Sequence, residues 1–332
     1  RDRSPSRGLG DVYKRQPMDR ISLSKDPARR TPKSLGLAIM HAKKVALIIE
    51  GGGMRNSYTA ACIEQLLAHD IHFGWVGGVS AGASHTVNFL SGDRTRARES
   101  FLSIPADQRA GGLASLMRGT GYFHAEYIYE IAGGPDQDLP FDFDTFFADE
   151  SQFSISAVRA DTGETVRWGR GDQHSPQDLM KQVRASSTVP GLMPMPVIDG
   201  IPYVDGALGD TGGIVLPDAI ADGFDRFLIL ATKPRNYTRP PLRSPQLAKV
   251  ALRKYPAVAE AAISRHGRYN AVREQMAQLE REGKAMIFYP ENMSVSNTER
   301  RLAKLQRNYQ LGLAQTKREF PQWLEFLSDA NS

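Results

Sequence analysis

The sequence predicts an α/β fold with a largely parallel sheet, and two consecutive strand–turn–helix units are the main reason. The apolar run VALIIE (45–50) has strand length and β-branched residues, which is typical of a strand buried on both faces. It leads directly into Gly51-Gly52-Gly53 and then into residues 56–70, whose apolar side chains recur at helical spacing. A second unit follows, with the strand FGWVGGV (73–79), a turn at Ser80 and another helical pattern. Strands that alternate with helices in this way indicate a parallel sheet covered by helices.

The alternation continues in the second half of the chain. Residues 153–169 predict a β-hairpin, and residues 175–187 predict a helix. GIPYVDGAL (200–208) predicts a short strand that ends in a turn, and DRFLILATKP (225–234) predicts another buried strand. These elements form one predicted α/β domain over residues 45–235.

Residues 236–332 are predicted to form a mostly helical extension packed on that domain. The pattern is helical from about residue 244, apart from a predicted strand at AMIFYPE (285–291). Six basic residues are spaced among the apolar positions, and we interpret them as a solvated helix face in preference to a membrane-facing basic helix. They are Lys249, Arg253, Lys254, Arg265, Arg268 and Arg273.

The net charge of +5 comes from the amino-terminal end of the chain. Residues 1–44 carry 12 Lys and Arg against 4 Asp and Glu, whereas the rest carries 30 against 33. This segment is rich in Ser, Pro and Arg and has no helical or strand period, which predicts a disordered basic arm. Its first residues, 1–17, resemble translated sequencing-adapter sequence, so we expect the native chain to begin near Met18. We do not expect the arm to bind nucleic acid.

Composition excludes several classes of protein. Hydrophobic residues at 41% and charged residues at 24% are ordinary for a soluble globular protein. No apolar run approaches the ~18 residues of a transmembrane helix. The single cysteine, Cys62, excludes an internal disulfide and a multi-cysteine metal site. A cytoplasmic location is therefore expected.

Ser80 has the setting of a catalytic nucleophile. It lies in Gly78-Val79-Ser80-Ala81-Gly82, a G-x-S-x-G pattern that chance alone produces often. Here a strand delivers the serine and a helix follows it, while Gly78 and Gly82 let the backbone pack tightly around a nucleophile elbow. The N–H groups at the start of that helix would face charge that develops on a bound carbonyl.

The glycine loop suits an oxyanion hole better than a phosphate-binding loop. The lysine of a P-loop is missing, and Asn56 stands where a dinucleotide-binding loop requires its third glycine. Gly51, Gly52 and Gly53 can turn their N–H groups into a pocket, and Arg55 adds a positive charge. A plain tight turn after a strand explains the same glycines equally well.

The general base is less evident from the residues. None of the seven histidines lies in a turn-rich catalytic setting: His85 falls within the helix after Ser80, and His266 lies inside a helical pattern. Asp205 ends a predicted strand, and Gly206 and Ala207 leave room around it. An ordinary Asp-Gly turn is the alternative interpretation.

Three motifs in this chain order resemble the patatin-like phospholipase family: EGGGMR (50–55), GVSAG (78–82) and DGA (205–207). Residues 184–210 are similar to the family's connection into its aspartate, and the carboxy-terminal part resembles that of bacterial members. The chain departs from the family pattern at Asn56, which replaces a loop glycine. Asparagine tolerates left-handed backbone angles, so we expect the loop to be retained.

The resemblance implies a patatin-like three-layer α/β/α sandwich and a lipid acyl hydrolase of the phospholipase A or lysophospholipase type. Ser80 would be the nucleophile and Asp205 its base, in a dyad without histidine. Gly51, Gly52, Gly53 and Arg55 would hold the oxyanion, and no metal or cofactor would be needed. The substrate would be a lipid or other acyl ester, reached by peripheral contact with a membrane surface.

Two alternatives remain open at the level of sequence. One is a Ser-His-Asp esterase on small soluble esters, with His266 as the base. The other is a non-catalytic module that binds an anion with the glycine loop and the helix terminus.

Overall fold

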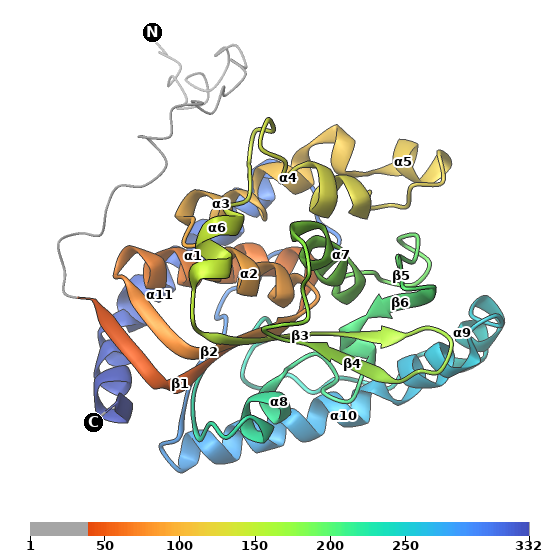
Figure 1. Ribbon diagram of the computed structural model, residues 1–332. Helices are drawn as coiled ribbons and strands as arrows, with labels where there is room; N and C mark the ends of the chain where they lie inside the picture. Colours follow the sequence, from red (N-terminus) through yellow and green to blue (C-terminus); the bar gives the residue numbers. More distant parts are fainter. Residues whose placement is uncertain (1–38, 332) are drawn as a thin grey trace, which may run out of the picture.

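An eight-stranded sheet lies at the centre of residues 39–331, the part of the chain that this computed structural model describes (Figure 1). In chain order its strands are β1 (Met40–Ile49), β2 (Ile71–Val79), β3 (Gln152–Arg159), β4 (Thr165–Trp168), β5 (Val197–Ile198), β6 (Ile201–Asp205), β7 (Arg226–Leu230) and β8 (Ala285–Phe288). They are hydrogen-bonded in the order β5-β6-β3-β2-β1-β7-β8, and β4 also pairs with β3. The β3, β2, β1, β7 and β8 strands are parallel, whereas β4 and β6 run antiparallel to β3. The largely parallel sheet that the sequence predicted is confirmed.

Helices cover both faces of this sheet and complete three layers (Figure 1). One face carries α1 (Asn56–Ala68), α2 (Ala81–Leu90), α7 (Pro176–Ser186) and α11 (Leu302–Asn331), and the other carries α8 (Leu216–Ala221) and α10 (Pro256–Arg281). The β1 strand serves both cores, because successive side chains of a strand point to opposite faces. Leu47 and Ile49 are buried in the first core, and Ala46 and Ile48 in the second.

Short helical elements between α2 and β3 form a cap over the α1–α2–α7 layer, with α4 and α5 at the top of Figure 1 and α6 lower down, beside α2. They are α3 (Arg94–Glu99), α4 (Ser103–Ala106), η3 (Gln108–Ala110), α5 (Leu113–Met117), η4 (Tyr127–Ile131) and α6 (Phe143–Ala148). This agrees with the short helices that the apolar and aromatic pattern of residues 94–150 indicates.

The first strand begins earlier than the sequence predicted. Most of the predicted basic arm, residues 1–44, lies outside the described residues, but its end does not: β1 starts at Met40, five residues before Val45. Met40 pairs with Ile71, and its N–H donates to Asp70 O at 3.1 Å. The early residues of β1 are partly exposed and include Lys43 and Lys44, so they carry no continuous apolar signal.

Residues beyond 235 belong to the same sheet and its helical layers. The predicted strand at 285–291 is β8, which pairs in parallel with β7. After α9 (Pro245–Ala251), Pro256 occupies the first turn of α10, where a missing N–H is tolerated. The α11 helix continues through Pro321 to Asn331, because Phe320, Trp323 and Leu327 bury its face in the core over β1.

Candidate active site

Ser80 occupies a strained turn between β2 and α2. Its backbone has φ 58° and ψ −128°, a positive φ that side-chain-bearing residues rarely adopt. A Cβ atom at Gly78 would meet the Gly82 carbonyl at 2.4 Å, and one at Gly82 would meet Ile49 O at 2.2 Å. The two glycines of the motif are therefore required by close backbone contact around the turn.

Asp205 approaches Ser80 from the opposite direction. Within β3, Ser156 pairs with Val79 of β2, and the next residue, Ala157, pairs with Asp205 of β6. The β4 strand pairs with Ile155–Val158 along the other edge of β3. The β2 and β6 strands therefore lie along the same edge of β3, where the carboxyl end of β2 faces the carboxyl end of β6. The Ser80 hydroxyl donates to Asp205 Oδ2 at 2.7 Å.

The backbone after Asp205 orients its carboxylate. Ala207 N–H donates to Asp205 Oδ1 at 2.8 Å, and the Asp205 N–H donates to Thr188 O at 2.7 Å. A Cβ at Gly206 would lie 2.1 Å from Ser156 O and 2.6 Å from a Val79 methyl, so only glycine fits against β2 and β3 there. The D-G-A motif thus leaves one carboxylate oxygen for Ser80 alone.

Burial raises the pKa of Asp205 above that of an ordinary carboxyl group. The side chain is 6% exposed, and desolvation disfavours its charged form. The Arg265 and Arg239 charges and the hydrogen bonds from Ala207 and Ser80 act in the opposite direction, but burial prevails. The carboxylate is therefore a stronger base than an exposed aspartate.

The glycine loop lies beside Ser80, although not all of its N–H groups are available to a ligand. Gly51 N–H donates to Gly213 O at 3.1 Å, which corrects its prediction as an oxyanion donor. Gly53 N–H and Ala81 N–H have no acceptor within residues 39–331, and both residues line the same cavity as Ser80. Gly53 has φ 55°, and a Cβ there would meet Asn297 O at 2.4 Å.

Asn56 retains the loop for a different reason from the one predicted. Its backbone is right-handed, with φ −67°, so tolerance of left-handed angles plays no part. The side chain is fully buried. In the amide orientation that gives both side-chain atoms a partner, the oxygen accepts from Gly52 N–H at 3.2 Å and the nitrogen donates to Glu50 O at 3.3 Å. Asn56 thus ties the loop together by side-chain hydrogen bonds and reduces the availability of Gly52 N–H.

A cavity of about 380 Å³ opens above Ser80 and Asp205. This volume lies within the usual range of ligand pockets. Much of its wall is apolar and comes from α2, from the cap and from the loop after α7: Val87, Phe101, Ile104, Phe123, Ile128, Leu139, Val189, Leu192 and Met193. The polar part contains Arg55, Lys233, Tyr237, Arg239 and Arg265 in addition to the glycine loop. The cavity therefore suits a ligand with an apolar chain and a polar end.

No histidine of the described residues lines this cavity. His85 of α2 is fully buried, its Nε2 lies 3.0 Å from Asn56 O, and burial lowers its pKa to about 4. His266 lies on α10 with its Nδ1 3.0 Å from Ile263 O of the same helix.

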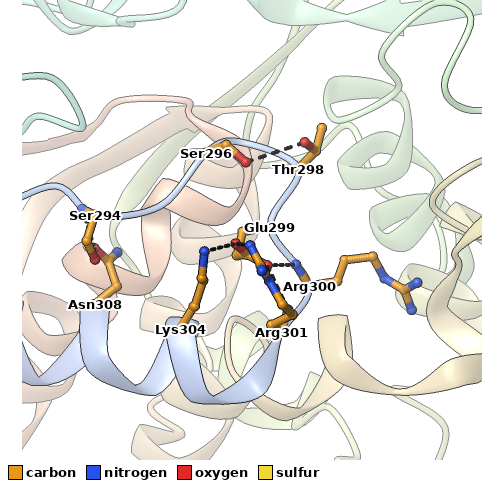
Figure 2. A network of polar contacts seen from close by, with 8 residues as sticks. All are labelled: Ser294, Ser296, Thr298, Glu299, Arg300, Arg301, Lys304 and Asn308. Carbon is orange, nitrogen blue, oxygen red and sulfur yellow. Dashed lines mark hydrogen bonds and ion pairs between the residues drawn. The ribbon is translucent and has the colours of Figure 1, made fainter.

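The carboxy-terminal region contributes residues that the sequence did not single out. Figure 2 shows Glu299 accepting hydrogen bonds from Arg300 and Arg301 at the start of α11, and Asn308 of α11 accepting from Ser294. The Arg300 side chain reaches across to Pro105 O and Asp107 O of the cap. In the segment held in this way, Asn297 O accepts a hydrogen bond from Met54 N–H at 3.0 Å, and Asn297 and Thr298 line the cavity.

Three of the six basic residues that were interpreted as a solvated face point inward, which corrects that interpretation. Arg265 donates to Gly212 O at 2.9 Å, Arg268 donates to Leu208 O and Gly209 O, and Arg273 donates to Pro234 O and Arg235 O. These carbonyls lie outside the strands and lack strand partners, so the arginines satisfy them. Arg253 and Lys254 are exposed, and Lys249 pairs with Glu260 at 2.7 Å.

Over residues 39–331, no three or more His, Cys, Asp or Glu side chains gather closely enough to hold a metal ion. In the same part of the chain, no helix combines the length and apolar character needed to cross a membrane.

Parts of the chain are similar to known protein families. Residues 47–217, slightly more than half of the chain, match the family model of the patatin-like phospholipases, and residues 255–328 match a domain family of unknown function (DUF6363). The uncharacterized protein YjjU of Escherichia coli strain K12 is 24% identical over 217 residues, which cover 62% of this chain and 58% of YjjU. The chain thus matches less than two thirds of that relative's length. The crystal structure of VipD from Legionella pneumophila aligns with a TM-score of 0.46 at 14% identity, over 86% of this chain and 67% of VipD.

Proposed function

The chain belongs to the patatin-like phospholipase family, and we propose that it hydrolyses lipid acyl esters through Ser80 and Asp205. The observation that carries this proposal is the 2.7 Å hydrogen bond from Ser80 Oγ to Asp205 Oδ2 in a strained turn beside a cavity. Candidate substrates are phospholipids, lysophospholipids and related acyl glycerides.

The reaction would proceed through an acyl-serine intermediate. Ser80 Oγ attacks the ester carbonyl carbon while its proton passes to Asp205 Oδ2. Asp205 then protonates the leaving alcohol oxygen as the ester bond breaks. In the second half, a water molecule gives a proton to Asp205 and attacks the acyl carbon, and Ser80 regains its proton as the free carboxylic acid departs.

The negative charge on the carbonyl oxygen would be stabilised by N–H groups that are already oriented. Gly53 N–H and Ala81 N–H are the available donors, whereas Gly52 N–H donates to the Asn56 side chain. Ala81 also begins α2, whose amino terminus favours negative charge. Arg55 adds a positive charge to the same wall.

A dyad is favoured over a Ser-His-Asp triad with His266. The Ser80 hydroxyl already donates directly to a carboxylate whose pKa burial raises, and no described histidine lines the cavity. The non-catalytic alternative gives no reason for the strained backbone of Ser80.

Peripheral contact with a lipid surface is the remaining part of the proposal. Exposed apolar side chains lie on α5 (Leu113 72% and Met117 82% exposed) and on α9 (Leu247 67% and Val250 65%). Both helices lie toward the right of Figure 1. In the loop after α5, Tyr122 N–H donates to Leu192 O at 2.7 Å. Leu192 belongs to the loop after α7, whose side chains line the cavity. Such a surface would let an acyl chain enter from a membrane without crossing bulk water.

The nucleophile can be identified by treating the protein with an organophosphonate that mimics an acyl ester and locating the added mass. We expect the label on Ser80, and neither label nor ester hydrolysis in a folded Ser80→Ala variant. Ser84→Ala is the matched control, because Ser84 lines the same cavity one turn further along α2. Labelling of Ser84 or Ser187, or hydrolysis that persists in Ser80→Ala, would overturn the proposal.

A further inference from the structure

Five basic side chains line the cavity that also contains Ser80 and Asp205, and one of them, Arg96 of the cap, already donates to Asn88 Oδ1 and Leu139 O. The other four are Arg55, Lys233, Arg239 and Arg265. We call them the basic cluster. Only Arg55 lies within the residues that match the patatin-like phospholipase family, whereas Arg265 lies in the region that matches the domain of unknown function. The cluster is therefore mostly built by parts of this chain outside the family's shared motifs.

The cluster has no carboxylate partner. None of its four members forms an ion pair with a residue in 39–331, although many other arginines of the same region do. Lys233 Nζ lies 4.3 Å from the centre of the Tyr237 ring, and the Arg239 guanidinium lies 4.8 Å from that of Tyr269. The Nε atoms of Arg55 and Arg239 are buried and have no hydrogen-bond partner there. A buried donor left in this state is destabilising unless a ligand satisfies it.

The four charges also repel one another. Burial is the largest influence that lowers the pKa values of Arg55, Lys233 and Arg265, and the charge of Arg239 lowers each of them further. The nearby carboxylates raise some of these pKa values, but their oxygens are already engaged. Glu50 accepts from Tyr269 OH at 2.7 Å and from Thr232 N–H at 2.6 Å, and Asp205 accepts from Ser80 and Ala207.

We infer that the basic cluster is a subsite for a phosphate-type anion carried on the alcohol side of the scissile ester. Guanidinium groups present planar, paired donors that match phosphate oxygens, and the ammonium of Lys233 adds a point charge. The apolar wall from the cap suits the acyl chain, and the phosphate would lie beside the basic cluster in the same cavity. This inference rests on the proposed function and selects acyl glycerophosphates over neutral glycerides as its substrate class. The phosphate takes no part in bond breaking and leaves with the alcohol.

The test compares two esters that differ only in the phosphate: an acylglycerol phosphate and the monoacylglycerol with the same chain, each in the same neutral detergent micelles. We expect kcat/KM to favour the phosphate ester by about tenfold or more, which corresponds to ~1.4 kcal/mol. Lys233→Gln and Arg239→Gln should each reduce that ratio severalfold. Arg239→Lys, which retains the charge but not the paired donors, should lie between Arg239→Gln and the wild type.

The matched control is Arg243→Gln, which removes the same charge from an exposed position that does not line the cavity. Thermal unfolding of every variant separates loss of the subsite from loss of the fold. A ratio near one in the wild type, or an equal fall in Arg243→Gln and Arg239→Gln, would overturn the inference.

Binding to the Ser80→Ala protein separates the subsite from the hydrolytic reaction. Calorimetric titration with the acylglycerol phosphate should show binding that weakens when Arg239→Gln is added to Ser80→Ala. If millimolar inorganic phosphate displaces the bound acylglycerol phosphate, the subsite accepts free phosphate as well as a lipid head group. If only another acylated phosphate displaces it, the subsite is specific for the lipid head group. If the wild type hydrolyses neither ester, the proposed hydrolysis fails, while binding still decides the subsite. Absence of binding, or binding that Arg239→Gln leaves unchanged, would overturn the inference itself.

Discussion

Ser80 and Asp205 come from two strands that meet end to end along one edge of β3, and their side-chain oxygens lie 2.7 Å apart. Val79 and Asp205 pair with adjacent β3 residues, Ser156 and Ala157. Pairing with β3 therefore fixes the positions of the Ser80 and Asp205 backbones relative to each other. The hydrogen bond from Ala207 N–H fixes the orientation of the Asp205 carboxylate. A dyad held by backbone pairing is pre-organised before substrate binds.

The strain at Ser80 predicts a difference between two inactive variants. A side-chain-bearing residue with this positive φ costs about 1–3 kcal/mol, which glycine largely avoids. Ser80→Gly should therefore have a free energy of unfolding about 1 kcal/mol higher than Ser80→Ala, measured by urea denaturation. Equal stability of the two variants would mean that the turn is not strained.

Replacement of Asp205 by asparagine should abolish turnover and leave the fold intact. Asparagine has nearly the same size but cannot take the Ser80 proton, so kcat should fall on the order of 10³–10⁴-fold. Binding of a non-hydrolysable substrate analogue, followed by calorimetry, should change little. Turnover within tenfold of the wild type would assign the base to another residue.

The raised pKa of Asp205 predicts how stability depends on pH. The folded state binds this proton more tightly than the unfolded state, so the free energy of unfolding falls as pH rises from the ordinary pKa of ~3.9 through the raised value. At pH 7 the buried charge is therefore destabilising, and Asp205→Asn should have a higher Tm than the wild type. The difference should shrink on acidification, and a lower Tm for the variant at pH 7 would contradict the burial argument.

The same group predicts one acidic limb in the activity profile, at a pH above the ordinary carboxyl range, because only the carboxylate accepts a proton. Joint replacement of His85 and His266 by residues that do not titrate should leave this limb in place. Loss of hydrolysis in a folded double variant would instead indicate a histidine base.

Removal of the Arg55 charge should slow catalysis at the glycine loop. Loss of one group that stabilises an oxyanion typically lowers kcat by about 10²–10³-fold, so Arg55→Ala is expected in or near that range. Its Tm should fall little, because the buried Arg55 Nε makes no hydrogen bond within the described residues. An unchanged kcat would leave Gly53 and Ala81 as the only donors.

The exposed apolar side chains of α5 predict a dependence on the lipid surface. Leu113→Gln with Met117→Gln should lower hydrolysis of esters in vesicles severalfold more than hydrolysis of the same esters below their aggregation concentration. Ile220→Gln is the control, since Ile220 is 38% exposed on α8, which covers the other face of the sheet. Equal losses on dispersed and aggregated substrate would remove the role of α5 in surface contact.

Local patterns in the amino-acid sequence were sufficient for the order of the elements and for the motifs that meet at the site. The β1 core run, the turn at Ser80 and the strand before Asp205 each combine residues close in the chain whose apolar period or glycine content reflects backbone geometry. The family followed from three such motifs in one order, and the match over residues 47–217 confirms it.

Tertiary structure alone decided which groups remain free at the site. Gly51 N–H donates to Gly213 O, and the Arg265 side chain donates to Gly212 O, so both contacts join residues far apart in the sequence. Asn56 stands in place of a loop glycine and holds the loop by side-chain hydrogen bonds. No local pattern encodes such pairs, because a helical basic residue has the same spacing whether its side chain faces solvent or a loop carbonyl. The basic cluster was hidden for the same reason: its four members are scattered from Arg55 to Arg265, and only the folded chain gathers them around Ser80.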